Sequence, residues 1–380
     1  MNIILIITGL GMGGAERQVC DLADQFANKG HSVLLISMTG ETVNRPQSNE
    51  VEVAELNMTK TPLGFIKAYL QARQLIQQFK PDVVHSHMVH ANLFARLLRL
   101  TGKIKRLICT AHNTNEGGRG RMLAYRLTDV LCDLSTNVSQ EAADIYVKRG
   151  AAPASRIVAM PNGIDTARFT FNPECRASLR QQLQLSDNTP LILAVGRLTA
   201  AKDYPNLLTA FSQLPAEFSH TQLAIIGIGE EQANIVALAT QLGLSNRVHF
   251  LGLQRNVHEW MSAADIYVMS SAWEGMPLVL LEAMSCERIV VATDCGGVKE
   301  VVGDCGILVP AKNSPALAQG LQNGLALSTD VAKAQGAAAR ARVIEKYSLT
   351  AQADKWLALY QSVIPHLILL FSVLDGDRPF

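Results

Sequence analysis

Short apolar runs alternate with longer amphipathic stretches along most of the chain. Six runs in the first half have the length and composition of buried strands: Ile3–Thr8, His31–Met38, Val51–Leu56, Val83–His87, Arg106–Ala111 and Ile157–Met160. Between most of them lie segments with the period of a helix, such as Ala15–Lys29, which Gly30 is well placed to end. Continuously apolar strands separated by helices predict a parallel sheet covered on both faces.

The alternation stops in a polar stretch from Asn162 to Pro190 and then starts again. The second set of predicted strands comprises Leu191–Val195, Gln222–Ile226, Val248–Leu251, Ile266–Ser270, Ile289–Thr293 and Ile307–Val309. We therefore predict two consecutive doubly wound α/β domains. Ligands bind such sheets beyond the carboxyl ends of the strands, so two facing domains would hold a site in the cleft between them.

Composition narrows the class of protein. The 380 residues include 34 Lys and Arg against 33 Asp and Glu, so a strongly basic nucleic-acid binder is not expected. The apolar run Leu367–Leu374 is too short to span a bilayer, and the N-terminus lacks the features of a signal peptide. The seven cysteines show no metal spacing, which indicates reduced thiols and a cytoplasmic protein.

A glycine-rich loop follows the first predicted strand. Gly9, Gly11 and Gly14 satisfy the GxGxxG pattern of dinucleotide-binding oxidoreductases. Such a site needs an acidic residue at the end of the second strand, where Ser37 and Met38 stand instead. We therefore favour a loop that approaches phosphate through its backbone N–H groups over an NAD site. A tight turn without a ligand is the simpler alternative.

Two carboxylates flank the start of a predicted helix in the second half of the chain. Glu274 precedes the helix and Glu282 lies inside it, with Pro277 suited to its first turn. The free N–H groups of Leu278 and Val279 lie between them. Carboxylates accept hydrogen bonds from sugar and ribose hydroxyls, and a helix N-terminus attracts phosphate. A paired-carboxylate hydrolase and acids that merely complement the helix dipole are the alternatives.

Two further loops add complementary groups. Arg197 and Lys202 follow the first strand of the second domain, and two cations at a strand end suit a diphosphate. Gly296, Gly297 and Glu300 follow another strand and supply backbone donors and a carboxylate. Three strand ends thus offer cations, donors and carboxylates together.

These motifs resemble the retaining GT-B glycosyltransferases of family 4. The resemblance is carried by the Glu-x7-Glu pair, by "GR…K" at Gly196–Lys202, by "GG..E" at Gly296–Glu300 and by "GGAER" at Gly13–Arg17. In addition, "MPNGID" at Met160–Asp165 resembles the segment by which these enzymes leave the first domain. The resemblance spans about residues 1–362 and implies two facing Rossmann-like domains with a nucleotide-diphosphate sugar in the cleft.

The resemblance also implies domain boundaries. Residues 1–165 would form the acceptor-side domain and residues 166–346 the nucleotide-sugar domain, with a helix over 347–363 that returns to the first. The tail, residues 364–380, lies beyond the family pattern and has no assigned role.

The roles of individual residues follow from the resemblance. It implies that Glu282 binds the ribose, that Glu274 binds hydroxyls of the transferred sugar, and that Arg197 and Lys202 neutralise the leaving diphosphate. His112 matches a histidine that positions donor sugar and acceptor. Glu300 fits the pattern without a role. The remaining donor-binding residues would be Gly13, Gly14, Leu251, Gln254, Gly275, Met276, Leu278 and Val279.

No metal or other cofactor is expected. His85, His87 and His90 could suggest a metal site, but Asp82 is the one further ligand nearby. The resemblance agrees, because Arg and Lys neutralise charge in these enzymes. No side-chain nucleophile is apparent, and the family's account is front-side substitution, in which the leaving phosphate takes the acceptor proton.

The near-zero total charge hides a basic segment. Residues 60–126 carry a net charge of +10 and the rest of the chain −9. "ANLFARLLRLTGKIKRL" within it mixes apolar and basic positions in the manner of an interfacial helix. We hypothesise peripheral docking on the inner face of the cytoplasmic membrane, where a lipid-linked or glycan acceptor is presented. The alternative is an ordinary basic helix face packed on the sheet.

Together these features predict a retaining glycosyltransferase of surface-glycan biosynthesis, that is, of capsule, O-antigen or lipopolysaccharide. A nucleotide-sugar epimerase or a disaccharide synthase is the alternative on the same fold. An NAD-dependent oxidoreductase and a catalytically silent partner of another transferase are the alternatives from other classes.

Overall fold

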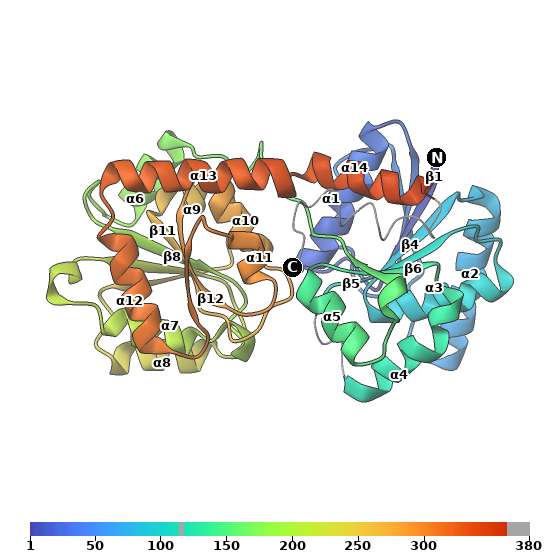
Figure 1. Ribbon diagram of the computed structural model, residues 1–380, viewed down its shortest axis with the longest axis horizontal. Helices are drawn as coiled ribbons and strands as arrows, with labels where there is room; N and C mark the ends of the chain where they lie inside the picture. The colour runs from blue at the N-terminus through green and yellow to red at the C-terminus, as the bar shows by residue number, and fades with distance from the viewer. Residues whose placement is uncertain (114–117, 363–380) are drawn as a thin grey trace. The chain divides into compact units, whose positions relative to one another are not determined.

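The computed structural model describes residues 1–113 and 118–362, which divide into two compact units (Figure 1). Unit 1 comprises Met1–Gly163 and the described residues from Leu349 on, and unit 2 is Ile164–Ser348. Both breaks lie two residues from the boundaries expected at 165 and 346. Glu116 and the tail 364–380 lie outside the described residues.

Unit 1 contains a seven-stranded parallel sheet in the order β3-β2-β1-β4-β5-β6-β7. Its strands are β1 (Asn2–Ile7), β2 (Ser32–Ser37), β3 (Val51–Glu55), β4 (Val83–His87), β5 (Leu107–Ala111), β6 (Leu134–Asn137) and β7 (Ile157–Ala159). Six of them confirm the predicted strands. The strand β6 was not predicted, because "LSTN" contains a single strongly apolar side chain.

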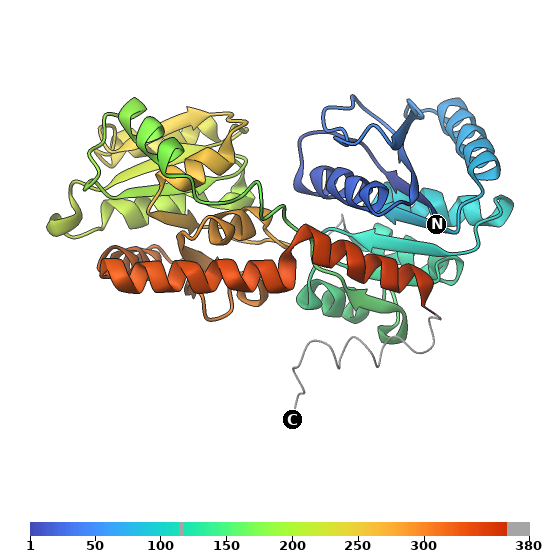
Figure 2. The same ribbon diagram turned by 90° about the horizontal axis from the view of Figure 1, so that it is seen from above.

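Helices cover both faces of this sheet. Ile3 and Leu5 pack towards α1 and α14, whereas Ile4 and Ile6 pack towards α2 and α3. In Figures 1 and 2, α14 lies beside α1. The helices of unit 1 are α1 (Gly14–Asn28), α2 (Pro62–Phe79), α3 (Val89–Thr101), α4 (Gly118–Thr128), α5 (Gln140–Lys148) and α14 (Leu349–Gln361).

Buried polar contacts fix α14 on unit 1. The Arg106 guanidinium donates hydrogen bonds to the carbonyl oxygens of Leu359, Tyr360 and Ser362 at the C-terminal end of the helix. A cation is favourable there because the last carbonyl groups of a helix carry partial negative charge. In addition, the Tyr360 hydroxyl lies 2.6 Å from His85 Nδ1 inside the sheet.

Unit 2 contains a six-stranded parallel sheet in the order β10-β9-β8-β11-β12-β13. Its strands are β8 (Leu191–Val195), β9 (Gln222–Ile226), β10 (Val248–Gly252), β11 (Ile266–Met269), β12 (Ile289–Asp294) and β13 (Ile307–Pro310). All six were predicted. The helices of this unit are α6 (Pro173–Gln182), α7 (Tyr204–Ser212), α8 (Gln232–Gln241), α9 (Val257–Ala263), α10 (Leu278–Ser285), α11 (Val298–Val302), α12 (Ser314–Leu325) and α13 (Thr329–Tyr347).

The basic segment is partly internal. Arg96 is fully buried and donates to the Tyr125 carbonyl and the Ser135 hydroxyl. Arg99 forms a bidentate pair with Asp133, with nitrogen to oxygen distances of 2.5 and 2.8 Å. The expectation that this segment presents its charge outward is therefore wrong for Arg96. One of the positive charges counted in the net charge of +10 lies inside the unit. Across the described parts of the chain, every helix is too short or too polar to cross a bilayer.

Arg106 and Lys103 provide a test of this internal role. We expect Arg106→Ala to lower the free energy of unfolding by about 2 kcal/mol, because several carbonyl groups lose a charged donor. Lys103 is exposed in the same segment, so Lys103→Ala should change stability by less than about 0.5 kcal/mol. Urea unfolding measures both values. Equal effects of the two substitutions would show that Arg106 does not hold α14.

Candidate active site

Loop backbones approach each other closely at the carboxyl ends of the unit 2 strands. Gly227 has a φ of +144°, and a Cβ placed on it would lie 1.9 Å from the Gly196 carbonyl oxygen. Gly296 has a φ of +57°, and its Cβ would lie 2.1 Å from the Glu274 carbonyl oxygen. Only glycine satisfies both the conformation and the space at these two positions. These contacts join the loop after β9 to the loop after β8, and the loop after β12 to the loop after β11.

Hydrogen bonds between backbones join the same loops. The N–H groups of Gly227, Ala272 and Gly297 donate to the carbonyl groups of Gly252, Ala201 and Gly275 at 2.8, 2.8 and 2.9 Å, respectively. The structure therefore brings together four of the predicted segments, which are Gly196–Lys202, Leu251–Gln254, Glu274–Val279 and Gly296–Glu300. The loop after β9 belongs to the same surface and was missed, although "GIGE" after a predicted strand was a usable signal.

A charged pair lies at the centre of these loops. Lys202 Nζ lies 2.5 Å from Glu274 Oε1, and the Ser271 hydroxyl donates to the same oxygen at 2.6 Å. The Ser270 hydroxyl donates to the Lys202 carbonyl at 2.8 Å. The Lys202 and Glu274 side chains are 21% and 13% exposed, so both are reachable yet shielded from bulk water. The two serines were not predicted, because serine at a strand end is common.

Arg197 stands apart from this pair. Its side chain is exposed, and no ion pair or hydrogen bond to it occurs within the described residues. The Tyr204 hydroxyl donates to the Gly196 carbonyl at 3.0 Å and holds the turn before Arg197. Burial raises the pKa of Tyr204 well above its usual value of 10, so this hydroxyl remains a donor.

The second carboxylate lies one turn inside α10. Glu282 is 6% exposed, and Met276 is buried in the loop before the helix. Leu278 and Val279 are half-buried in the first turn, where N–H groups have no partner within the helix. Pro277 was predicted in the first turn of this helix. It is instead the N-cap residue, one position before that turn. It offers no capping side chain.

The remaining predicted residues of unit 2 line the edges of this surface. The Gln254 side chain donates to the Leu251 carbonyl at 2.8 Å across Gly252, whose φ is +65°. Glu300 is exposed on α11, and its carbonyl accepts hydrogen bonds from Arg342 and Tyr347. The Glu300 backbone therefore fastens α13, which gives this residue a structural contact that the sequence did not predict.

In unit 1, the glycine loop already faces a carboxylate. Gly13 is the N-cap of α1 and Gly14 is its first residue. The Glu16 side chain folds back, so that a Cβ on Gly13 would lie 2.1 Å from Glu16 Oε2. A carboxylate is favourable at a helix N-terminus, and Glu16 therefore occupies part of the space where phosphate was predicted.

His112 lies directly after β5, where it contacts a second histidine. Its Nε2 is 3.1 Å from His87 Nδ1, so one ring donates a proton that the other accepts. Burial lowers the pKa of His112 to about 4 and that of His87 well below 6.5. Both rings are therefore neutral at pH 7. The contact with His87 was not predicted.

Both ring nitrogens of His85 contact hydroxyl groups of neighbouring side chains. Its two ring nitrogens lie 2.6 Å from the hydroxyl oxygens of Tyr360 and Thr110. His90 is exposed on α3. Within residues 1–113 and 118–362, no group of three or more His, Cys, Asp or Glu side chains is arranged to hold a metal ion.

Comparisons with known proteins follow the division of the chain. Residues 12–168 match the family described as Glycosyltransferase Family 4, and residues 176–342 match Glycosyl transferases group 1. The chain is 26% identical to the lipopolysaccharide core biosynthesis glycosyltransferase LpsE of Rhizobium meliloti, over 82% of this chain and 85% of that protein.

Two further comparisons cover nearly the whole chain. A Campylobacter jejuni diphospho-undecaprenol 4-alpha-N-acetylgalactosaminyltransferase is 26% identical over 93% of this chain and 98% of its own length. The crystal structure of Anabaena HepE in complex with UDP superposes with a TM-score of 0.84 at 22% identity, covering 96% of this chain and 100% of HepE.

The two family matches together account for most of the chain, and each coincides with one Rossmann-like sheet. The predicted fold class is confirmed by the structure and by its solved neighbours. The chain is a GT-B glycosyltransferase and belongs to family 4.

Proposed function

We propose that this glycosyltransferase moves a sugar from a nucleotide-diphosphate sugar to a lipid-linked or polysaccharide acceptor in surface-glycan biosynthesis, with retention of configuration. The observation that carries the proposal is the Lys202–Glu274 pair, whose two loops also carry exposed Arg197 and lead into the N-terminus of α10. Cations, free N–H groups and a carboxylate on one surface suit a diphosphate joined to a sugar. The names of LpsE, the Campylobacter transferase and UDP-bound HepE support it.

Each residue of this surface receives a role in the proposal. Arg197 and Lys202 bind the diphosphate and stabilise its charge as it leaves. Glu274 accepts hydrogen bonds from the transferred sugar, and Glu282 accepts them from the ribose. Leu251 and Gln254 hold the base, and the α10 entrance comprises Gly275, Met276, Leu278 and Val279. The Gly296–Gly297 turn supports that entrance. Gly13 and Gly14 belong to unit 1 and keep their proposed role of approaching the phosphates.

The reaction needs no side-chain nucleophile. The bond from the anomeric carbon to the phosphate oxygen breaks while a bond from the acceptor oxygen forms on the same face. The proton of the acceptor hydroxyl passes to the departing phosphate oxygen, so the charges balance. We expect no metal and no cofactor besides the donor, because Arg197 and Lys202 supply positive charge where the diphosphate separates.

Nucleotide binding tests the donor assignment directly. We expect UDP, GDP or ADP to raise the melting temperature, because a ligand at one hundred times its Kd stabilises the folded state by about 2.7 kcal/mol. Glu282→Gln should reduce this shift, whereas Glu345→Gln, at an exposed position of α13, should not. A thermal-shift panel measures all three proteins. A folded enzyme that none of the nucleotides stabilises would refute the donor site.

The proposed role of His112 is tested by substitution and by pH. We expect His112→Ala to lower transfer by roughly 100-fold while nucleotide binding persists. Since the pKa of His112 is lowered to about 4, the neutral ring predominates above that value. Transfer should therefore stay level from pH 8 to about 5 and fall as His112 gains a proton near pH 4.

Steady-state rates across that range provide the measurement, with His90→Ala, at an exposed position of α3, as the matched control. Full transfer by a folded His112→Ala enzyme would remove this residue from the mechanism.

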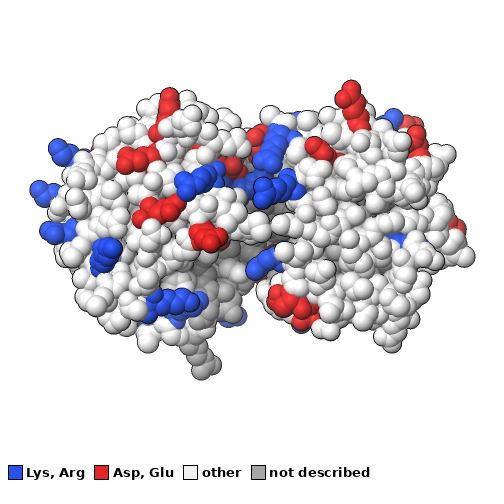
Figure 3. Space-filling view, turned by 180° about the vertical axis from the view of Figure 1, so that it is seen from behind, with Lys and Arg blue, Asp and Glu red and all other residues white. Residues whose placement is uncertain are grey.

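The surface of unit 1 that carries α2 and α4 supports membrane docking. Several apolar side chains on α2 and α4 are more than half exposed, and exposed lysines and arginines lie among them. The apolar ones are Leu63, Ile66, Leu70, Leu123 and Leu127. The basic ones are Lys60, Lys67, Lys103, Arg121 and Arg126. Figure 3 shows several Lys and Arg side chains along the left-hand edge of that view, which belongs to unit 1. We propose that this face contacts an anionic bilayer.

Vesicle sedimentation tests the membrane proposal. We expect binding to vesicles that contain phosphatidylglycerol at low salt, with about 1 kcal/mol from each basic residue near the surface. The double substitution Leu63→Ser and Ile66→Ser should abolish it. A control pair on unit 2, Val331→Ser and Ile344→Ser, removes apolar side chains that are 50% and 46% exposed and should leave binding intact. If both double variants lose vesicle binding, or if neither does, docking through this face is contradicted.

A further inference from the structure

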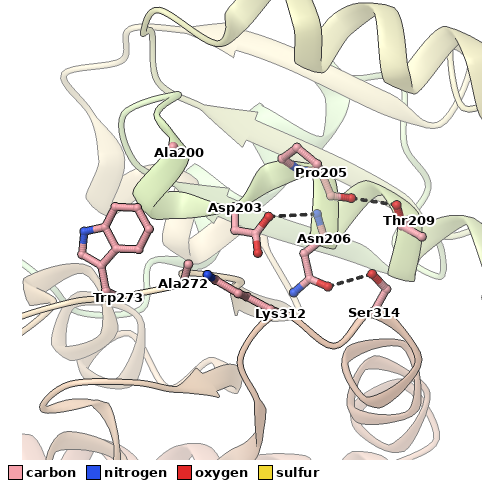
Figure 4. A pocket seen from close by; sticks show the side chains of 9 residues that line it. All are labelled: Ala200, Asp203, Pro205, Asn206, Thr209, Ala272, Trp273, Lys312 and Ser314. Carbon is pink, nitrogen blue, oxygen red and sulfur yellow. Dashed lines mark hydrogen bonds between the residues drawn. The ribbon is translucent and has the colours of Figure 1, made fainter.

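A shallow pocket of about 520 Å³ opens on unit 2 next to the loops of the proposed donor site (Figure 4). Three segments line it, namely the start of α7, the loop after β11 and the start of α12. Its volume is within the range of small-molecule sites. Asp203 and Trp273, which line it, are the chain neighbours of Lys202 and Glu274.

The nitrogen of a buried side-chain amide in this pocket lacks a hydrogen-bond partner within the described residues. Asn206 is 7% exposed, and its Oδ1 accepts a hydrogen bond from the Ser314 hydroxyl at 2.7 Å. Asn206 Nδ2 has no hydrogen-bond partner within the described residues, and Figure 4 shows it turned towards Lys312, away from Ser314. An unsatisfied buried N–H costs about 1–3 kcal/mol. Nδ2 has less than 1 Å² of accessible surface, so a ligand oxygen can accept its N–H and recover that energy only where a covering side chain moves aside.

The pocket also holds a pair of opposite charges beside an aromatic ring. Asp203 and Lys312 both have left-handed backbone, with φ of 46° and 56°. Such conformations are rare outside glycine and cluster at functional positions. The Trp273 side chain is half-exposed at the opposite end of the pocket from Ser314 (Figure 4). The carboxylate and the ammonium give the pocket no net charge.

These groups match a sugar ring. The face of an indole packs against the C–H face of a pyranose, while carboxylate and ammonium groups bind its hydroxyls. A phosphate would also suit Lys312 and the two helix starts, but the Asp203 carboxylate repels it. We propose that this pocket binds a pyranose ring of a neutral carbohydrate, as a second carbohydrate site beside the donor site. The proposal goes beyond the proposed function and does not depend on the donor roles.

An occupied pocket would share two loops with the Lys202–Glu274 pair. Asp203 follows Lys202 directly, and Trp273 directly precedes Glu274. The Ala272 N–H donates to the Ala201 carbonyl at 2.8 Å and ties the two loops together. A sugar that bridges Asp203 and Trp273 therefore restrains the backbone that carries the ion pair.

Tryptophan quenching provides the test. The chain has three tryptophans, of which Trp260 and Trp356 are 1% and 3% exposed and Trp273 is 50% exposed. Acrylamide therefore quenches Trp273 in preference to the others. We expect at least one of methyl α-D-glucopyranoside, methyl α-D-mannopyranoside, methyl α-D-galactopyranoside and N-acetylglucosamine to reduce the quenching constant roughly twofold.

Substitutions locate the bound sugar. Asp203→Asn keeps an N-cap residue that tolerates left-handed backbone, so it should preserve the fold while weakening sugar binding roughly tenfold. Asp330→Asn, in the first turn of α13, is the matched control and should not change binding. Trp273→Ala removes the fluorescent reporter, and saturation-transfer NMR of the same glycosides should then show the loss of binding.

The alternatives give different outcomes. Protection that disappears in Glu282→Gln would place the sugar at the donor site and overturn the proposal. Protection by inorganic phosphate alone, or by none of the glycosides, would overturn it as well. Failure of the nucleotides to bind would refute the donor site but would leave this quenching result unaffected, so the two failures are distinguishable.

Discussion

The site of unit 2 depends on how closely its loop backbones approach each other. A side chain at Gly227 would collide with the Gly196 carbonyl, and one at Gly296 would collide with the Glu274 carbonyl. A larger residue at Gly227 would push the loop after β9 away from the loop that carries Lys202, and one at Gly296 would push the loop after β12 away from the loop that carries Glu274. Two positions without a side chain thus help to place the loops that carry the charged pair.

Much of the fold was predictable because buried parallel strands are continuously apolar. Twelve of the thirteen strands within the described residues stand out in the sequence for this reason. The exception, β6, is an interior strand whose polar residues are satisfied by neighbours. Arg96 donates to the Ser135 hydroxyl, and the Thr110 hydroxyl lies 2.6 Å from that of Thr136. Such pairing becomes visible only once the strands lie side by side, so hydrophobicity alone could not reveal it.

The candidate site was predictable at the level of loops and not of contacts. The carboxyl ends of parallel strands meet at one edge of a sheet. The sequence alone therefore predicted that the segments around Arg197 and Glu274 lie together. The fold-back of Glu16 over Gly13 depends on a rotamer, and no spacing rule predicts it. The net charge of residues 60–126 did not predict the position of Arg96, because a sum over residues does not distinguish a buried guanidinium from an exposed one.

The Lys202–Glu274 pair also constrains how a donor could enter. Under the proposed roles, the ammonium group binds the diphosphate and the carboxylate binds the sugar, yet in this structure each is bonded to the other. An exposed ion pair contributes only about 0–1 kcal/mol to stability. Breaking a partly shielded pair is costly chiefly when one of its two charges is left without a partner. A donor that supplies both an anion and hydroxyl groups leaves neither charge alone, because it exchanges both partners at once. A nucleotide diphosphate without the sugar would satisfy Lys202 but leave the Glu274 carboxylate with the Ser271 hydroxyl as its remaining side-chain hydrogen bond in the described chain. Under the proposed roles, the pair would therefore favour a complete donor over its product, and this difference would assist product release.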